Sequence, residues 1–206
     1  PKKDANHVPS SNPWANFGIV LKNVPALAGI SIAMWASAGN ELVNLIFGIW
    51  LEDSFGLQIA ALAGASAVIG LSELSGEGLV ALLTDRIGKP RALALGLSAN
   101  AGAAILLPLI GQTEVGALIG LFLFYITFEY TLVSHISMVT ELVPSARATA
   151  MAFNVTGHSL GRAIGAFLAP FIYRQYGFLF VALLAVVFNV FGLLALGRLR
   201  KDGSAQ

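Results

Sequence analysis

The chain has 206 residues, of which 56% are hydrophobic and only 11% are charged, and its mean hydropathy is +0.78. That composition excludes an ordinary soluble globule, which needs more polar residues to cover its surface. The formal net charge of +1 gives no reason to predict a nucleic-acid partner. Because cysteine is absent, disulfides and cysteine-ligated metals are excluded. The composition therefore predicts an integral membrane protein surrounded by a lipid bilayer.

Six apolar runs follow one another, and each approaches or exceeds the roughly 20 residues that cross a bilayer as a helix. They cover residues 24–51, 57–84, 92–110, 115–141, 148–173 and 178–199. Residues 1–23 are interpreted as a polar, linker-like cytoplasmic lead and an interfacial segment anchored by Trp14 and Phe17, and residues 200–206 as a cytoplasmic tail. The sequence thus predicts an all-α protein with a six-helix transmembrane bundle over residues 24–199.

The basic residues predict the orientation of this bundle. If the N-terminus lies inside, ten of the twelve Lys and Arg residues fall in inner segments, whereas Arg174 alone lies in an outer loop and Arg162 lies within a span. Short cytoplasmic loops of membrane proteins carry such an excess of Lys and Arg. We therefore expect both termini in the cytoplasm and the bundle in the cytoplasmic membrane.

Charged side chains divide the six spans into two kinds. The third and sixth spans carry none, whereas the other four carry acids, histidines or an arginine. Because a charge facing lipid is costly, the charged spans are expected to surround something polar. The same division recurs after every third helix, which predicts an inverted repeat of three helices, an architecture found in transporters. Two tetrapeptides at the ends of the second and fifth spans, Asp85–Gly88 and Arg174–Gly177, share a final glycine and weakly support this prediction.

Acidic residues in the first two spans are candidate groups for substrate binding or proton coupling. Glu41 lies between Asn40 and Asn44, and Glu73 and Glu77 share one face of the second span. Two carboxylates so close in a low dielectric do not easily both ionise, which suits a proton carrier. Structural ion pairing with Arg162 is the alternative interpretation.

The loop that follows the second span is short and highly charged. It contains Asp85, Arg86, Gly88, Lys89 and Arg91, with Pro90 at the start of the next helix. This pattern resembles the signature loop of the major facilitator superfamily, with Ala81 at the place of its leading glycine. The resemblance implies a cytoplasmic latch that holds one state closed through ion pairs.

Two further features lie in and after the fourth span. Glu129 lies among aromatic residues, which would suit a cationic or amphipathic substrate, although aromatic residues more often only pack. Glu141, Pro144 and Arg147 are similar to the ending of the fourth helix of a superfamily half, where Glu141 would pair with Arg86 or Arg147. These motifs imply that the chain resembles the C-terminal six-helix half of such a transporter, of the efflux or drug:proton antiporter type.

The fifth span carries two stripes at four-residue spacing. One contains Asn154, His158 and Arg162, and we expect Arg162 to pair with Glu73 or Glu129 or to bind an anionic substrate. The other stripe consists of glycines, which let another helix approach closely: Gly157, Gly161 and Gly165. The resemblance to the family implies that this helix lies at the interface between the two halves of the transporter.

Enzymatic functions are disfavoured. Residues 157–161 match the G-x-S-x-G pattern of lipases, but they lie within an apolar helical run, and no histidine follows Ser159. No nucleotide-binding motif, metal cluster or cofactor site is present in the sequence. The predicted function is therefore proton-coupled efflux of a small organic molecule by alternating access.

A single six-helix half would need a second six-helix bundle, either a missing N-terminal half or a second copy. The alternative is a membrane module that stabilises a partner and transports nothing.

Overall fold

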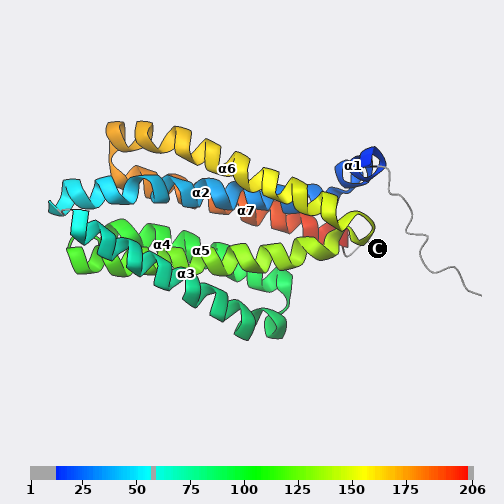
Figure 1. Cartoon of the computed structure of the whole chain (residues 1–206), viewed down its shortest axis with the longest axis horizontal. Helices are drawn as coiled ribbons and strands as arrows, with labels where there is room; N and C mark the ends of the chain where they lie inside the picture. Colours follow the sequence, from blue (N-terminus) through cyan, green and yellow to red (C-terminus); the bar gives the residue numbers. More distant parts are fainter. Residues whose placement is uncertain (1–12, 57–58, 204–206) are drawn as a thin grey trace, which may run out of the picture.

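The computed structural model describes residues 13–56 and 59–203, and all regular structure within these ranges is helical (Figure 1). The expected lead at residues 1–12 and the last three residues of the tail lie outside the described residues. In chain order, the elements are α1 (Pro13–Lys22), α2 (Val24–Phe55), α3 (Ile59–Ile87), α4 (Lys89–Ile110), α5 (Glu114–Leu142), the short 3₁₀ helix η1 (Pro144–Ala146), α6 (Arg147–Tyr176) and α7 (Phe178–Gly203).

Local chemistry sets the ends of these helices. The side chains of Asn23 and Thr113 accept hydrogen bonds from the first turns of α2 and α5, as N-caps do. The α3–α4 and α6–α7 connections turn at Gly88 (φ 84°) and Gly177 (φ 80°), in a region that side chains other than glycine disfavour. The chain therefore reverses at a positive-φ glycine after both α3 and α6.

Five of the six long helices are apolar and long enough to cross a membrane, namely α2, α3 from Ala63 onward, α4, α5 and α7. The exception is α6, which has 30 residues and the necessary length but carries polar and small residues along its packed face. By length and composition, five of the six expected membrane-spanning helices are therefore supported. A helix whose apolar surface is partly replaced by contacts with protein does not need a uniformly apolar sequence.

The long helices pack in a regular pattern. Helix α2 packs extensively against α6 and α7, α5 packs against α3 and α4, and α4 also contacts α7. Short connections keep sequence neighbours antiparallel, so the N-terminal end of α2 and the C-terminal end of α7 lie at the same end of the bundle (Figure 1). We call it the basic end, because it carries Lys22, Arg86, Lys89, Arg147 and Arg198.

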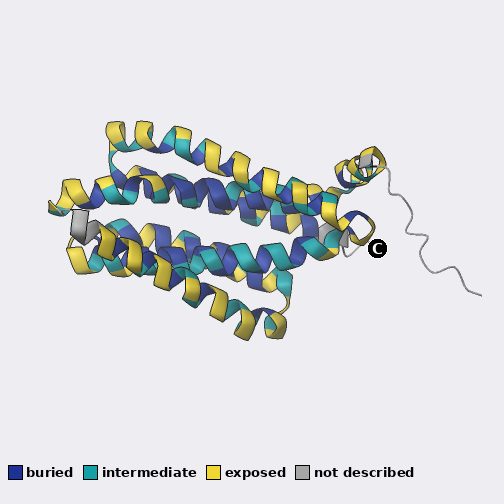
Figure 2. Ribbon diagram, viewed as in Figure 1, coloured by how far each residue is buried: buried dark blue, intermediate teal, exposed yellow. Residues whose placement is uncertain are grey.

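Burial is unequal among the helices (Figure 2). Only 22% of the most apolar stretch of α3 is buried, compared with 44% to 56% of the equivalent stretches in the other four candidate spans. Helix α6 also presents exposed residues along its length, and Phe167 is 82% exposed. Two long helix faces, one on α3 and one on α6, therefore have no protein neighbour among the described residues.

Candidate functional site

A polar cavity of about 290 Å³ lies between the four helices that carry charged side chains or histidine within their apolar runs. Its lining comes from α2, α3, α5 and α6, in agreement with the distribution of charge along the sequence, and α4 and α7 contribute nothing to it. The cavity is lined by Ser37, Asn40, Glu41, Asn44, Glu73, Phe128, Glu129, Leu132, His158 and Arg162. Five of the predicted site residues therefore meet at one place, whereas Glu77 and Asn154 are not part of the lining.

Arg162 pairs with Glu41 across the α2–α6 contact. Its Nε donates to Glu41 Oε2 at 3.0 Å, and the Glu41 side chain is largely buried while the Arg162 side chain remains 64% exposed. The expected pairing of Arg162 with Glu73 or Glu129 is wrong. Glu41 lies on the helix that packs most closely against α6, so the arginine meets this acid first. The charge of Arg162 is thus largely neutralised by the protein itself.

Glu73 and Glu129 line the same cavity without such compensation. Among the described residues, neither carboxylate lies within ion-pair distance of a Lys, Arg or His side chain. Gly76 brings their helices together, since a methyl group added at this glycine would come within 2.8 Å of the Ile126 carbonyl and the Glu129 side chain on α5. The role of Gly76 is not predictable from the sequence, because a lone glycine does not identify its neighbour.

Two histidines form a second polar cluster beside the cavity. The Nδ1 of His158 lies 2.6 Å from Ser37 Oγ, and the Nε2 of His135 lies 2.8 Å from the carbonyl oxygen of Gly29, to which it must donate. The ring centroids are 5.8 Å apart. His135 is 2% exposed and was not singled out from the sequence, although a histidine in an apolar span was a sufficient signal.

Several buried polar atoms near these rings have no hydrogen-bond partner among the described residues. They are Asn40 Oδ1, His135 Nδ1, Asn154 Oδ1 and His158 Nε2. Once His135 Nε2 donates to a carbonyl, the Nδ1 of a neutral ring can only accept. Asn40 Oδ1, Asn154 Oδ1 and His135 Nδ1 are thus buried acceptors without donors, which is costly, so this region is suited to groups that donate hydrogen bonds, such as a bound proton or an ammonium group.

The ion pair at the basic end of the bundle differs from the one expected. Lys89 Nζ at the start of α4 lies 2.6 Å from Glu141 Oε1 at the end of α5, and it also donates to the carbonyl of Ser137. The expected partners of Glu141, Arg86 and Arg147, do not pair with it. Among the described residues, the side chains of Asp85, Arg86, Arg91 and Arg147 form no ion pair.

Comparison with known proteins gives one match. The sequence model of the Major Facilitator Superfamily matches residues 30–206. The chain belongs to this superfamily. No curated protein and no solved structure matches the chain. Members of the superfamily transport small solutes across membranes and are not enzymes, which agrees with an all-helical integral membrane protein whose polar cavity is built from helices.

The glycine stripe of this superfamily chain faces inward. A methyl group added at Gly157 or Gly165 would lie 2.8 Å or 2.6 Å from the Ile30 or Ala38 carbonyl of α2, and one at Gly161 would overlap the Met34 carbonyl. The predicted close approach therefore exists, but its partner is α2 of the same bundle and not a second bundle. The same glycines account for the lipase-like pattern, because residues 157–161 lie in the middle of α6.

A buried amide pair joins α4 and α7, the helices that contain the two uncharged apolar runs. Asn189 Nδ2 on α7 donates to Asn100 Oδ1 on α4 at 2.9 Å, and Asn100 Nδ2 donates to the Phe124 carbonyl. Both asparagines are 1% exposed. Each is the twelfth residue of its own helix, so equivalent positions of α4 and α7 meet.

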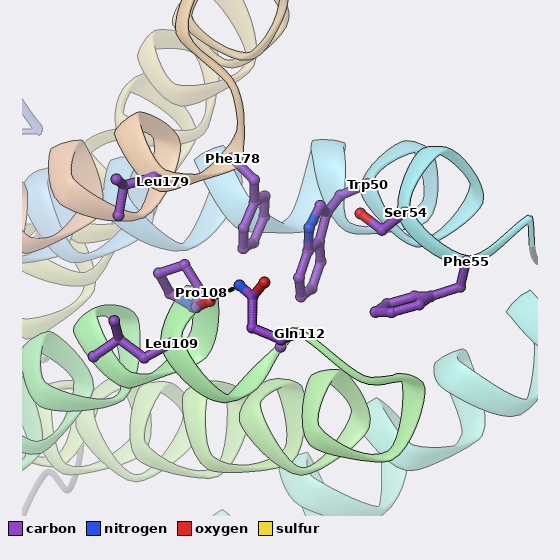
Figure 3. A pocket seen from close by; sticks show the side chains of 9 residues that line it. Trp50, Ser54, Phe55, Pro108, Leu109, Gln112, Phe178 and Leu179 are labelled. Atoms are coloured by element: carbon purple, nitrogen blue, oxygen red, sulfur yellow. Dashed lines mark hydrogen bonds between the residues drawn. The ribbon is translucent and has the colours of Figure 1, made fainter.

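A second cavity of about 390 Å³ lies at the end of the bundle opposite the basic end. Figure 3 shows the rings of Trp50 and Phe178 side by side, and their centroids are 3.9 Å apart with an interplanar angle of 3°. The side chain of Gln112 is hydrogen-bonded to the Pro108 carbonyl (Figure 3). Among the described residues, no titratable group lines this cavity, so their side chains offer packing surface but no proton-carrying group.

Proposed function

We propose that the chain is the C-terminal six-helix half of a superfamily transporter that exports a small organic molecule in exchange for protons. The observation that carries this proposal is the polar cavity, in which Glu73 and Glu129 lack a basic partner while Arg162 is already paired with Glu41. Unpaired carboxylates within a membrane cavity are expensive unless they bind a cation or a proton. The cavity thus favours a substrate with a cationic group over an anionic one.

The packing pattern supports an inverted repeat of three helices. If α2, α3 and α4 correspond to α5, α6 and α7, then the α2–α6 contact corresponds to the α5–α3 contact, and the α2–α7 contact to the α5–α4 contact. The positive-φ glycines Gly88 and Gly177 occupy equivalent connections, and Asn100 meets its counterpart Asn189 on the repeat axis. Such repeats place substrate sites near the middle of the membrane.

The uncovered faces of α3 and α6 support a second bundle. These helices border the cavity, and the side chain of Arg162 remains 64% exposed at its edge. A second six-helix bundle on this side would enclose the cavity, and rocking of the two bundles would expose it alternately to each side of the membrane. Either a separate N-terminal half or a second copy of this chain could supply that bundle.

The basic end is proposed to face the cytoplasm, with both termini on that side of the cytoplasmic membrane. This orientation rests on the excess of Lys and Arg in the segments at that end. The ion pair between Lys89 and Glu141, together with Asp85, Arg86, Gly88, Arg91 and Arg147 in the adjoining segments, is proposed as the cytoplasmic latch. His158 and Asn154, with Glu41 and Glu77, are proposed to support proton movement near the acids.

The first experiment is the native mass of the chain in lipid nanodiscs. A dimer would identify the second copy as the missing bundle, and a monomer would favour a separate half. The competing function, a membrane module that stabilises a partner, is supported if neither assembly transports any compound.

Transport itself is tested in proteoliposomes of the assembled unit, with an imposed pH gradient and a panel of organic cations and anions. We expect cations to move protons in the opposite direction and Glu73→Gln or Glu129→Gln to reduce this exchange at least about tenfold. Glu114→Gln, at the start of α5 and outside the cavity, is the matched control and should transport normally. Unchanged exchange in both cavity variants would refute the coupling role.

A further inference from the structure

A third cavity lies on the periphery of the helical bundle, away from the polar cavity. It occupies about 220 Å³ in a groove between α2 and α7, towards the basic end. The lining is apolar except for two side chains, and consists of Ser31, Trp35, Phe191, Leu194, Ala195 and Arg198. Because α7 contributes nothing to the polar cavity, this groove is not part of the proposed substrate path.

Aromatic contacts fix the wall of the groove. The Trp35 ring stacks on Phe188 with centroids 5.5 Å apart and meets Phe191 edge-on at 5.0 Å. Phe188 is buried, while Phe191 is 39% and Leu194 is 62% exposed. The groove therefore has a rigid floor anchored in the core and an open side that faces the hydrocarbon of the bilayer, which is the environment of an acyl chain.

Arg198 gives the groove a charge at one end. Its side chain is exposed, and no carboxylate up to Leu199, where the described side chains end, lies within ion-pair distance of it. Along α7 it lies about 14 Å from Asn189, which is near the middle of the helix, and this distance is close to half the thickness of the hydrocarbon layer. The guanidinium is thus at the level where lipid phosphates begin.

The second polar group of the groove is Ser31, which lies on the basic-end side of Trp35. Ser31 is one helical turn before Trp35 on α2, so both side chains share one face of the helix. Its hydroxyl makes no hydrogen bond to another described residue. A serine hydroxyl and a guanidinium can both donate hydrogen bonds to phosphate oxygens, and arginine does so in a bidentate manner.

We propose that this groove binds one anionic phospholipid, with its phosphate held by Arg198 and Ser31 and one acyl chain lying along Trp35, Phe191 and Leu194. A zwitterionic lipid is a poorer ligand, because its own ammonium group offsets the phosphate charge. The inference rests on the orientation given under the proposed function, since anionic lipids concentrate in the cytoplasmic leaflet. Bound there, the lipid would hold α7 against α2 on the side opposite the moving interface.

The test measures lipid selectivity and needs no transport substrate. The chain is placed in nanodiscs of phosphatidylcholine that contain a few mole per cent of either brominated phosphatidylglycerol or brominated phosphatidylcholine. Trp14→Phe and Trp50→Phe leave Trp35 as the only tryptophan, and bromine atoms on a bound acyl chain quench its fluorescence. A parallel native mass measurement on the unsubstituted chain counts the lipids of each type that remain bound, so the result does not depend on tolerance of the tryptophan substitutions.

We expect phosphatidylglycerol to be preferred about fivefold, the preference that one basic side chain near an anionic surface provides. Arg198→Gln should abolish the preference and Arg198→Lys should retain most of it. Arg174→Gln, at the opposite end of the bundle, is the matched control and should leave it unchanged. Equal quenching by the two lipids, or an undiminished preference in Arg198→Gln, would overturn the proposal. Since nanodiscs expose both leaflets to the same lipids, an error in the orientation or in the transport function would not alter this outcome.

Discussion

Arg162 donates to Glu41 at 3.0 Å in a pair whose members differ greatly in exposure, because the Glu41 side chain is 10% exposed and the Arg162 side chain is 64% exposed. The two partners should therefore not be equivalent. Removing the cation leaves a carboxylate buried without compensation, whereas removing the acid leaves a guanidinium that water can solvate.

From this asymmetry we predict that Arg162→Gln destabilises the chain by about 1–3 kcal/mol and Glu41→Gln by less than about 1 kcal/mol. Thermal unfolding in detergent, monitored by circular dichroism, measures both values. The double variant should resemble Glu41→Gln, because the uncompensated carboxylate is gone. Equal losses in the two single variants would contradict the assignment of Glu41 as the buried partner.

Gly161 is predicted to be the least replaceable residue of the glycine stripe. A methyl group there would overlap the Met34 carbonyl of α2, so Gly161→Ala forces the two helices apart and should cost about 1–3 kcal/mol. Gly70→Ala on α3 is the matched control, since nothing lies within 4 Å of its added methyl group. In the same thermal unfolding assay the control should be neutral or slightly stabilised, because alanine favours helix.

The amide pair between α4 and α7 is predicted to act as a unit. Asn189→Leu leaves Asn100 Oδ1 buried without a donor, and Asn100→Leu removes the bond to the Phe124 carbonyl. Each substitution should cost about 1 kcal/mol, and the double variant should cost less than the sum of the two. Strict additivity in thermal unfolding would show that the two side chains do not interact.

The tautomer of His135 is predicted from its contact with Gly29. Because Nε2 must donate to the Gly29 carbonyl, the neutral ring carries its proton on Nε2 and leaves Nδ1 bare. The chain has three histidines, so ¹⁵N-histidine NMR of His7→Gln in nanodiscs at neutral pH would contain only the signals of His135 and His158. His158→Gln identifies the His135 signal, and a proton on its Nδ1 would contradict the hydrogen bond.

Helix number and helix ends were largely predictable. The apolar runs gave all six long helices, and the segment expected to lie in the membrane interface forms the helix α1. The runs underestimated helix length, however, because a helix stops at a capping group and not where the hydrocarbon ends. Helix α2, for example, continues from Leu51 through the charged residues Glu52 and Asp53 until Gly56 ends it.

Sequence alone also determined which helices form the polar cavity. Charge within an apolar run identifies a helix that cannot face lipid, and this is a property of each helix taken separately. The candidate acids Glu41, Glu73 and Glu129, with His158 and Arg162, were therefore brought together correctly without any knowledge of packing. The turn at Gly88 is also a local feature, because a glycine in a short loop accepts the positive φ that the turn needs.

Only the tertiary structure decided which acidic and basic side chains form ion pairs with each other. Glu41, Glu73 and Glu129 all line one cavity with Arg162, and Glu141 has several basic residues in the neighbouring segments. The rotation of each helix about its axis selects one of them, and that rotation is set by close contacts such as Gly161 on Met34 and Gly76 on Ile126. Sequence spacing fixes depth and face along one helix, whereas partners across helices depend on packing between residues far apart in the chain.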